Sequence, residues 1–134
     1  MRTDVFFDTN VLLYFASEEP VKSARSATLL QGGGVVSAQV LNEFASVSLG
    51  GKRRLSFAEV RTTLNAVLAC CAVVPLTVET HLTGLRYAET HRLSVYDAMV
   101  LAAAVLSGCS VLYTEDMHDG LVVDGVTVRN PYKP

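Results

Sequence analysis

The sequence predicts an α/β fold: a three-layer α/β/α sandwich with a mostly parallel central sheet of roughly five strands. Short runs of apolar and β-branched residues alternate along the chain with longer segments whose apolar residues recur at helical spacing. Parallel strands need crossover connections, and helical crossovers cover both faces of such a sheet. The 134 residues, 50% of them apolar, suffice for one buried core, so we expect a single domain over residues 1–134.

Six short apolar runs are the candidate strands. The four principal ones lie at residues 5–7, 35–36, 73–76 and 111–113. Two further runs, 121–123 and 126–128, flank the pair Asp124-Gly125, which is typical of a tight hairpin turn. We expect the last run to form an edge strand.

Five helices are predicted from residues that start or stop a helical pattern. Each begins at a proline or after a side chain suited to cap a helix N-terminus: Pro20, Ser37, Ser56, Thr77 and Ser94. Ser56 with Glu59 forms a capping box, and glycines end several of the segments. The segment after Ser94, residues 95–106, is the most apolar helix of the chain.

Glu43 occupies an unusual place in the helix that follows Ser37. Val40, Phe44 and Val47 repeat at helical spacing, and Glu43 falls on the same face as these core candidates. A carboxylate on a buried face needs a reason. The alternative is that the predicted helical phase misplaces Glu43 and that its side chain is simply exposed.

Acidic residues also follow the predicted strands. Asp8 comes directly after the first strand and Asp116 after the fourth, at the sheet edge where ligands of α/β proteins bind. Glu43 lies near the start of one helix and Asp97 in the first turn of another, so both can point to the same edge. We therefore expect Asp8, Glu43, Asp97 and Asp116 to form one acidic pocket with catalytic and metal-binding roles, and Asp119 to be a second, weaker loop ligand.

Four gathered carboxylates predict a bound divalent cation. Two unit charges about 6 Å apart repel by roughly 3 kcal/mol at an effective dielectric constant near 20, and four acids form several such pairs. Protonation or a divalent cation must offset this repulsion. Because the candidate ligands are all oxygen atoms, with no Cys or His at metal-ligand spacing, Mg²⁺ or Mn²⁺ is favoured over zinc.

Each acid also has a purely structural explanation. Asp97 stands three residues after Ser94, where it can complement the helix dipole, and Asp8 can form a turn with Thr9 and Asn10. A loop acid such as Asp116 is commonly only solvated. The structural and functional roles can coexist.

The overall charge does not by itself indicate a nucleic-acid partner. The formal net charge is −2, so RNA would have to be held by bound metal or by a local basic cluster. The dense cluster is Lys52, Arg53 and Arg54, which either contacts phosphates or relieves the exposed carbonyls at a helix C-terminus.

Composition also bears on the compartment. Nothing near the N-terminus resembles a signal peptide, and the longest apolar runs are shorter than the roughly 18–20 residues that span a bilayer. The three cysteines match neither a disulfide framework nor a zinc spacing. We expect a cytoplasmic protein with reduced thiols.

The order of these motifs resembles the PIN domain, and more narrowly the VapC-like toxins of type II toxin-antitoxin systems. The resemblance extends over essentially the whole chain. It rests on the segments Asp8-Thr9-Asn10-Val11-Leu12-Leu13, Asn42-Glu43 within residues 37–43, Tyr96-Asp97-Ala98, Thr114-Glu115-Asp116 and the closing residues 126–131.

The resemblance implies an endoribonuclease in which Asp8, Glu43, Asp97 and Asp116 hold Mg²⁺ or Mn²⁺, supported by Asn10 and Thr114. It also implies a homodimer and a small antitoxin protein that blocks the acidic pocket. The chain departs from the family after Asp116, where members often have an aromatic residue. That departure leaves open whether Asp116 or Asp119 is the main loop ligand.

Two other functions fit parts of the sequence. A haloacid-dehalogenase-like phosphatase also has an aspartate after its first strand, but it needs a second aspartate two residues on, where this chain has Asn10. A non-catalytic RNA- or protein-binding relative of the same fold is the second alternative. The presence of all four acids argues against it.

Overall fold

The computed structural model describes residues 2–134 and contains one six-stranded sheet. The strand order is β3-β2-β1-β4-β6-β5, and every neighbouring pair is parallel except β5 with β6. The strands are β1 (Val5–Phe7), β2 (Gly34–Ser37), β3 (Cys71–Val74), β4 (Val111–Tyr113), β5 (Val122–Val123) and β6 (Val126–Arg129). This arrangement confirms the predicted mostly parallel α/β fold.

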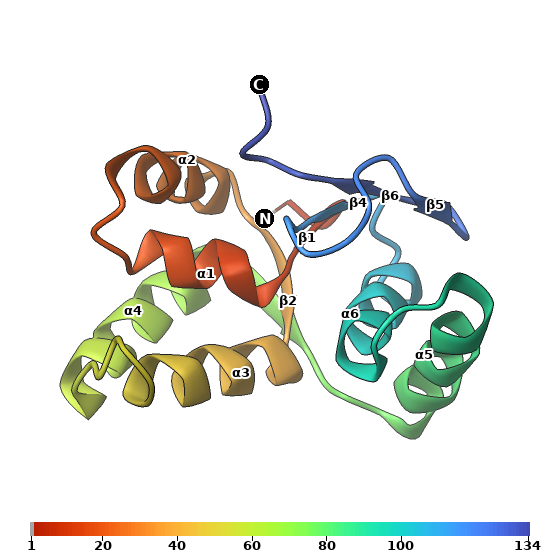
Figure 1. Cartoon of the computed structure of the whole chain (residues 1–134), viewed down its shortest axis with the longest axis horizontal. Helices are drawn as coiled ribbons and strands as arrows, with labels where there is room; N and C mark the ends of the chain where they lie inside the picture. Colours follow the sequence, from red (N-terminus) through yellow and green to blue (C-terminus); the bar gives the residue numbers. More distant parts are fainter. Residues whose placement is uncertain (1) are drawn as a thin grey trace.

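Within the described part of the chain six helices flank the sheet, and Figure 1 shows α1 to α4 on one side and α5 with α6 on the other. Among these, α5 and α6 pack closely on each other, and α6 contacts β2, β4 and β6. The helices are α1 (Thr9–Phe15), α2 (Pro20–Gln31), α3 (Ala38–Leu49), α4 (Phe57–Cys70), α5 (Val78–His91) and α6 (Val95–Leu106).

Strand β1 lies in the interior of the sheet, between β2 and β4. Its three side chains, Val5, Phe6 and Phe7, are all buried, which explains why this strand is continuously apolar rather than alternating. In the parallel register Phe7 pairs with Tyr113, so β1 and β4 end side by side. The residues that follow these two strands are therefore neighbours in space.

The cap residues predicted from sequence are confirmed at four helices. Ser37 accepts a hydrogen bond from the backbone of α3, Ser56 and Glu59 form a reciprocal capping box at α4, and Thr77 and Ser94 cap α5 and α6. Within α3, Val40 and Phe44 are fully buried, but Val47 is 49% exposed. The predicted core face of α3 is thus narrower than expected and leaves Val47 at the surface beside Glu43.

Helix α1 was not predicted, because Asp8, Thr9 and Asn10 favour a turn as well as a helix start. Asp8 has extended backbone angles and its carboxylate accepts a hydrogen bond from Thr9 N, so it is the N-cap of α1. The helix has only seven residues, too few for a clear repeat of apolar positions.

The sheet also differs in detail from the prediction. It has six strands rather than roughly five, and β3 begins two residues earlier than expected. The expected edge strand, β6, lies inside the sheet between β4 and β5, so the edge on this side is β5. The predicted turn is confirmed, since Asp124 (φ 46°) and Gly125 (φ 88°) both have the positive φ of a type I′ hairpin. No helix within residues 2–134 is long and apolar enough to cross a membrane.

Candidate active site

Asp8 is the most deeply placed acid of the site, with an exposed fraction of only 3%. One carboxylate oxygen, Oδ1, accepts from Thr9 N at 2.7 Å, and the other, Oδ2, accepts from Thr114 Oγ1 at 2.8 Å. Burial raises the pKa of Asp8 to about 7, and the charges of Asp97 and Asp116 add to this rise against the two hydrogen bonds. Asp8 is therefore held rigidly, and its negative charge is disfavoured in the protein alone.

Asn10 connects Asp8 to the loop after β4. Its Nδ2 donates to Thr114 Oγ1 and to Asp116 Oδ2, each at 3.0 Å, and its Oδ1 accepts from the backbone N of Glu115. The Thr114 hydroxyl also accepts from Asp116 N at 3.1 Å. Asn10 and Thr114 thus fix the carboxylates of Asp8 and Asp116 relative to each other.

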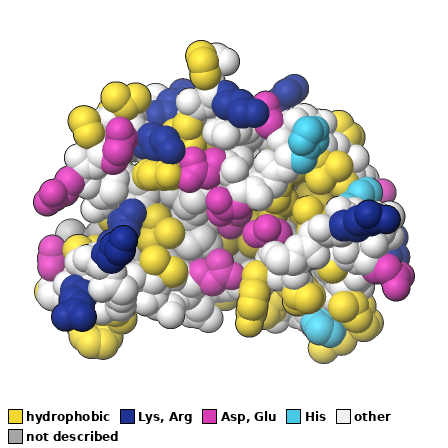
Figure 2. Space-filling view, viewed as in Figure 1, with side chains coloured by type: hydrophobic (Ala, Val, Ile, Leu, Met, Phe, Trp, Pro, Cys, Tyr) yellow, Lys and Arg dark blue, Asp and Glu magenta, His cyan; other side chains and the backbone are white. Residues whose placement is uncertain are grey.

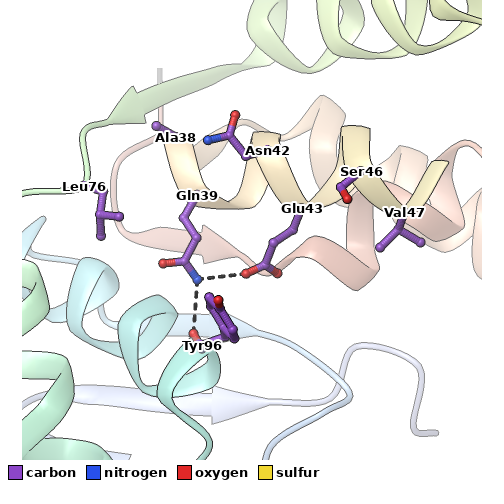
Figure 3. A pocket seen from close by; sticks show the side chains of 8 residues that line it. All are labelled: Ala38, Gln39, Asn42, Glu43, Ser46, Val47, Leu76 and Tyr96. Carbon is purple, nitrogen blue, oxygen red and sulfur yellow. Dashed lines mark hydrogen bonds between the residues drawn. The ribbon is translucent and has the colours of Figure 1, made fainter. Parts of the chain in front are cut away.

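Glu43 reaches the same region from α3. Its Oε2 accepts from Thr9 Oγ1 and its Oε1 from Gln39 Nε2, both at 2.9 Å. Gln39, one helical turn before Glu43, also donates to the carbonyl oxygen of Tyr96 at 3.2 Å, so α3 is joined to the start of α6 (Figure 3). The carboxylate is oriented by two neighbours, Thr9 on α1 and Gln39 on α3.

Asp97 is the third residue of α6, and its backbone N donates to the Ser94 cap. Partial burial raises the pKa of Asp97, the hydrogen bond with Ser94 opposes the rise, and the charges of Asp116 and Glu43 add to it. Asp97 therefore has the predicted structural role at the start of α6, and it also lies near the other acids.

The structure brings Asp8, Glu43, Asp97 and Asp116 to one region, which we call the acidic cluster. Figure 2 shows acidic side chains gathered in the middle of one face, between the α1/α3 side and the α6 side. The cluster runs from buried Asp8 to exposed Asp116. No group of three or more Asp, Glu, His or Cys side chains within residues 2–134 stands close enough to hold a metal ion without adjustment.

The chemistry of the cluster still fits a divalent cation. Its ligands would all be carboxylate oxygens, which suit Mg²⁺ or Mn²⁺. Burial, and after it the charges of the neighbouring acids, raise the pKa values of Asp8 and Asp97, and a cation beside the carboxylates would favour their ionised forms. Exposed Asp116 leaves the cluster open on one side for solvent or substrate.

Two other acids near the loop are engaged elsewhere. Asp119 accepts from Asn130 N at 2.8 Å and lies 4.0 Å from Lys133 Nζ, so the structure directs it to the C-terminal segment rather than to the acidic cluster. Glu115 accepts from the Tyr14 hydroxyl, and its Oε2 is 3.1 Å from Lys22 Nζ. Of the acids in this loop, Asp116 is the one that the hydrogen bonds join to Asp8 through Asn10 and Thr114.

The basic cluster lies on the turn between α3 and α4. Arg53 Nη1 donates to the Leu13 carbonyl at 2.7 Å and so joins the turn to α1, and Arg54 donates to the Gly51 carbonyl within the turn itself. Lys52 and Arg53 line a cavity of about 430 Å³ with residues that follow α1. Figure 2 shows basic side chains on the α3/α4 side of the face, apart from the central acids.

Thr9, Gln39, Tyr14 and Lys22 were not predicted as parts of the site. A signal existed for Gln39, because it stands four residues before Glu43 on the same helix and such pairs meet. Thr9 directly follows Asp8, but its contact with Glu43 spans 34 positions. No local pattern indicates the contacts of Tyr14 and Lys22 with Glu115, which lie 101 and 93 positions away.

The fold and the site define a class of protein: an α/β domain with an acidic cluster at the carboxyl edge of a mostly parallel sheet. The model of the PIN domain family matches residues 5–118. The chain therefore belongs to the PIN domain family.

Solved structures show the same fold. A toxin-antitoxin complex from Klebsiella pneumoniae superposes with a TM-score of 0.72 at 19% identity, over 97% of this chain and 99% of that one. The DNA-bound VapBC complex from Salmonella typhimurium gives 0.71 at 15% identity, over 97% and 99% of the two chains. Mycobacterium tuberculosis VapC20, a toxin that cleaves the sarcin-ricin loop, gives 0.68 at 16% identity, over 84% and 91%. No curated protein matches the chain.

Proposed function

We propose that this protein is a Mg²⁺- or Mn²⁺-dependent endoribonuclease that hydrolyses RNA phosphodiester bonds, and that it is the toxin of a toxin-antitoxin pair. The observation that carries the proposal is the acidic cluster, in which carboxylates from four parts of the chain lie in one region at the edge of the sheet. Membership of the PIN domain family and the similarity in fold to VapC toxins support it.

In this proposal Asp8, Glu43, Asp97 and Asp116 hold the cation. When bound, the cation activates a water molecule and stabilises the charge that develops on the scissile phosphodiester. Asn10 and Thr114 keep Asp8 and Asp116 in position, and Thr9 does the same for Glu43. The phosphodiester is itself an anion, so the carboxylates repel it until their charge is offset.

The proposed partners follow from the same similarity. Relatives of this fold were solved as toxin-antitoxin complexes, so we propose a small antitoxin that covers the acidic cluster, and a homodimer. Helix α5 exposes Val78, Leu82 and Leu85, which form an apolar surface suited to a protein partner. Exposed Lys52 and Arg54 remain proposed contacts for RNA phosphates, whereas the Arg53 guanidinium already donates a hydrogen bond to the Leu13 carbonyl.

The test is cleavage of a panel of structured RNAs by purified protein with Mg²⁺, Mn²⁺ or EDTA. The parent should cut in either metal and not in EDTA, and Asp8→Asn should abolish cleavage while it leaves the fold intact. Equal cleavage by parent and variant would show that the active site is assigned wrongly. A parent that binds metal but cuts none of the RNAs would instead favour a non-catalytic PIN domain.

A further inference from the structure

A groove opens directly beside the acidic cluster, between α3 and the start of α6 (Figure 3). Its volume is about 570 Å³, within the range of sites that bind small organic molecules. Glu43 lines the groove, so the groove and the acidic cluster share a side chain. A molecule that is bound at the cluster and extends past Glu43 therefore enters this groove.

The most exposed apolar side chain of the groove is Tyr96, at 70%. Its backbone carbonyl accepts from Gln39, so the main chain at this position is fixed while the ring remains free. Tyr96 lines the same groove as Glu43, so an aromatic ring and a carboxylate of the cluster share this groove. Exposed aromatic rings are the usual platforms on which proteins stack unpaired bases.

The other walls of the groove suit a base better than a phosphate. Val47 and Leu76 are about half exposed and supply apolar contact, and Asn42 and Ser46 supply an amide and a hydroxyl that can pair with a base edge. None of the residues that line the groove is a lysine or an arginine. A phosphate in the groove would therefore meet no cation and would lie beside Glu43.

We propose that this groove is a base-binding subsite in which an unpaired base next to the scissile phosphodiester stacks on Tyr96. The inference rests on the proposed function. Every phosphodiester in RNA carries a nucleoside on each side, so RNA held at the acidic cluster must place bases on the surrounding surface. The subsite makes single-stranded segments and loops the preferred substrates, because a paired base cannot leave its duplex without cost.

The test measures RNA binding in a protein that cannot cleave. All variants carry Asp8→Asn, and a labelled unstructured oligonucleotide is titrated in Mg²⁺ with fluorescence anisotropy as the readout. Adding Tyr96→Ala should weaken binding about 5- to 150-fold, the range measured for loss of one base–aromatic stack. Tyr96→Phe, which keeps the ring, should restore binding. The matched control is Phe57→Ala, which removes a similarly exposed ring (64%, against 70% for Tyr96) on α4, outside the groove.

A second series places an abasic residue at each position of the oligonucleotide in turn. At one position the abasic residue should weaken binding to the protein that retains Tyr96. It should not weaken binding to Tyr96→Ala any further, because the two changes remove the same contact. A duplex of the same sequence should bind more weakly and be insensitive to Tyr96→Ala. Additive losses, or unchanged binding by Tyr96→Ala, would overturn the subsite.

The controls separate this inference from the proposed function. If the parent cleaves RNA and Tyr96→Ala has the same KM and RNA affinity, the subsite is wrong and the nuclease stands. If RNA binds through Tyr96 but the parent never cleaves, the subsite stands and the catalytic proposal fails. If Tyr96→Ala alters only the sedimentation coefficient of the free protein, the groove holds a second copy of the chain and the subsite is overturned.

Discussion

Asp8 combines two roles that are usually found on different residues. It caps α1 through Thr9 N, and it is the buried member of the acidic cluster. A helix N-terminus favours a nearby negative charge, whereas burial and the acids around it oppose one, and the raised pKa shows that the opposing effects are larger. Asp8 therefore caps α1, although the ionised form of its carboxylate is electrostatically unfavourable.

This balance gives a prediction about pH. The folded-state pKa of Asp8, about 7, lies above its value in an unfolded chain, so the stability that protonated Asp8 contributes is fully present below about pH 4 and is lost as the pH rises through 7. In EDTA, the free energy of unfolding of the parent should rise relative to that of Asp8→Asn by roughly 3 kcal/mol between about pH 8 and pH 5. Urea unfolding of both proteins across this range measures it, and a constant difference would contradict the assignment.

Glu115 is predicted to position the neighbouring Asp116. It accepts from Tyr14, and Lys22 Nζ lies 3.1 Å from its carboxylate and 4.4 Å from the centre of the Tyr14 ring. Lys22→Met should loosen this part of the loop and weaken Mn²⁺ binding by a few-fold, less than the roughly tenfold or more that follows loss of a group bonded directly to a metal ligand.

Isothermal titration with Mn²⁺ measures that affinity, and an exchange of the two charges, Lys22→Glu with Glu115→Lys, should restore part of it. Arg2→Met is the matched control, because Arg2 and Asp4 form an exposed ion pair and the hydrogen bonds of the acidic cluster involve neither residue. Equal Mn²⁺ affinity in Lys22→Met and the parent would show that Glu115 has no positioning role.

The site residues differ in how far the sequence could identify them. Asp8 and Asp116 follow strands, and Glu43 lies among core positions of a helix, so local patterns pointed to all three. The contacts of Thr114 with Asp8 and of Tyr14 with Glu115 join residues more than a hundred positions apart. Such contacts depend on which strands become neighbours, and hydrophobic periodicity carries no information about that.

At the scale of elements, the caps were predictable and the short segments were not. Ser37, Ser56, Thr77 and Ser94 each accept the hydrogen bond that their side-chain chemistry favours. Helix α1 and strand β5 are too short for periodicity to identify them fully, and packing on the rest of the fold stabilises them. The position of β6 inside the sheet follows from its parallel pairing with β4, which no local signal encodes.

The contact between α5 and α6 leads to a prediction at this scale. A Cβ atom added at Gly84 would lie 2.6 Å from Met99 Sδ and 3.2 Å from Met99 Cα, so α6 itself would have to move. Gly84→Ala should therefore lower the free energy of unfolding by about 1 kcal/mol, since overpacking outweighs the better helix propensity of alanine.

Thermal unfolding measures this effect, and Gly50→Ala provides the control. At Gly50 an added Cβ would make only an ordinary contact of 3.4 Å with the Ser46 carbonyl, and the stability should stay within about 0.5 kcal/mol of the parent. A Gly84→Ala variant as stable as the parent would mean that α5 and α6 pack more loosely than the structure shows. This packing bears on the site because α6 carries Tyr96 and Asp97.

For the molecule as a whole, cation binding and folding are expected to be coupled. A ligand that binds only the folded protein stabilises it by about 2.7 kcal/mol at 100 times its Kd, which for a chain of this size raises the Tm by roughly 10 °C. Mn²⁺ should produce such a shift in the parent and a much smaller one in Asp8→Asn, measured by calorimetry at constant ionic strength. Equal shifts in the two proteins would place the bound ion outside the acidic cluster.

The strand order β3-β2-β1-β4-β6-β5 also has a consequence for protein synthesis. β1 leaves the ribosome first, yet its partner β4 and the hydroxyl that orients Asp8 lie 106 positions later along the chain. A translation product that stops before β4 contains Asp8, Glu43 and Asp97 but neither Thr114 nor Asp116. Truncated products therefore lack an assembled acidic cluster, and a growing chain remains without one until the fourth strand has emerged and paired.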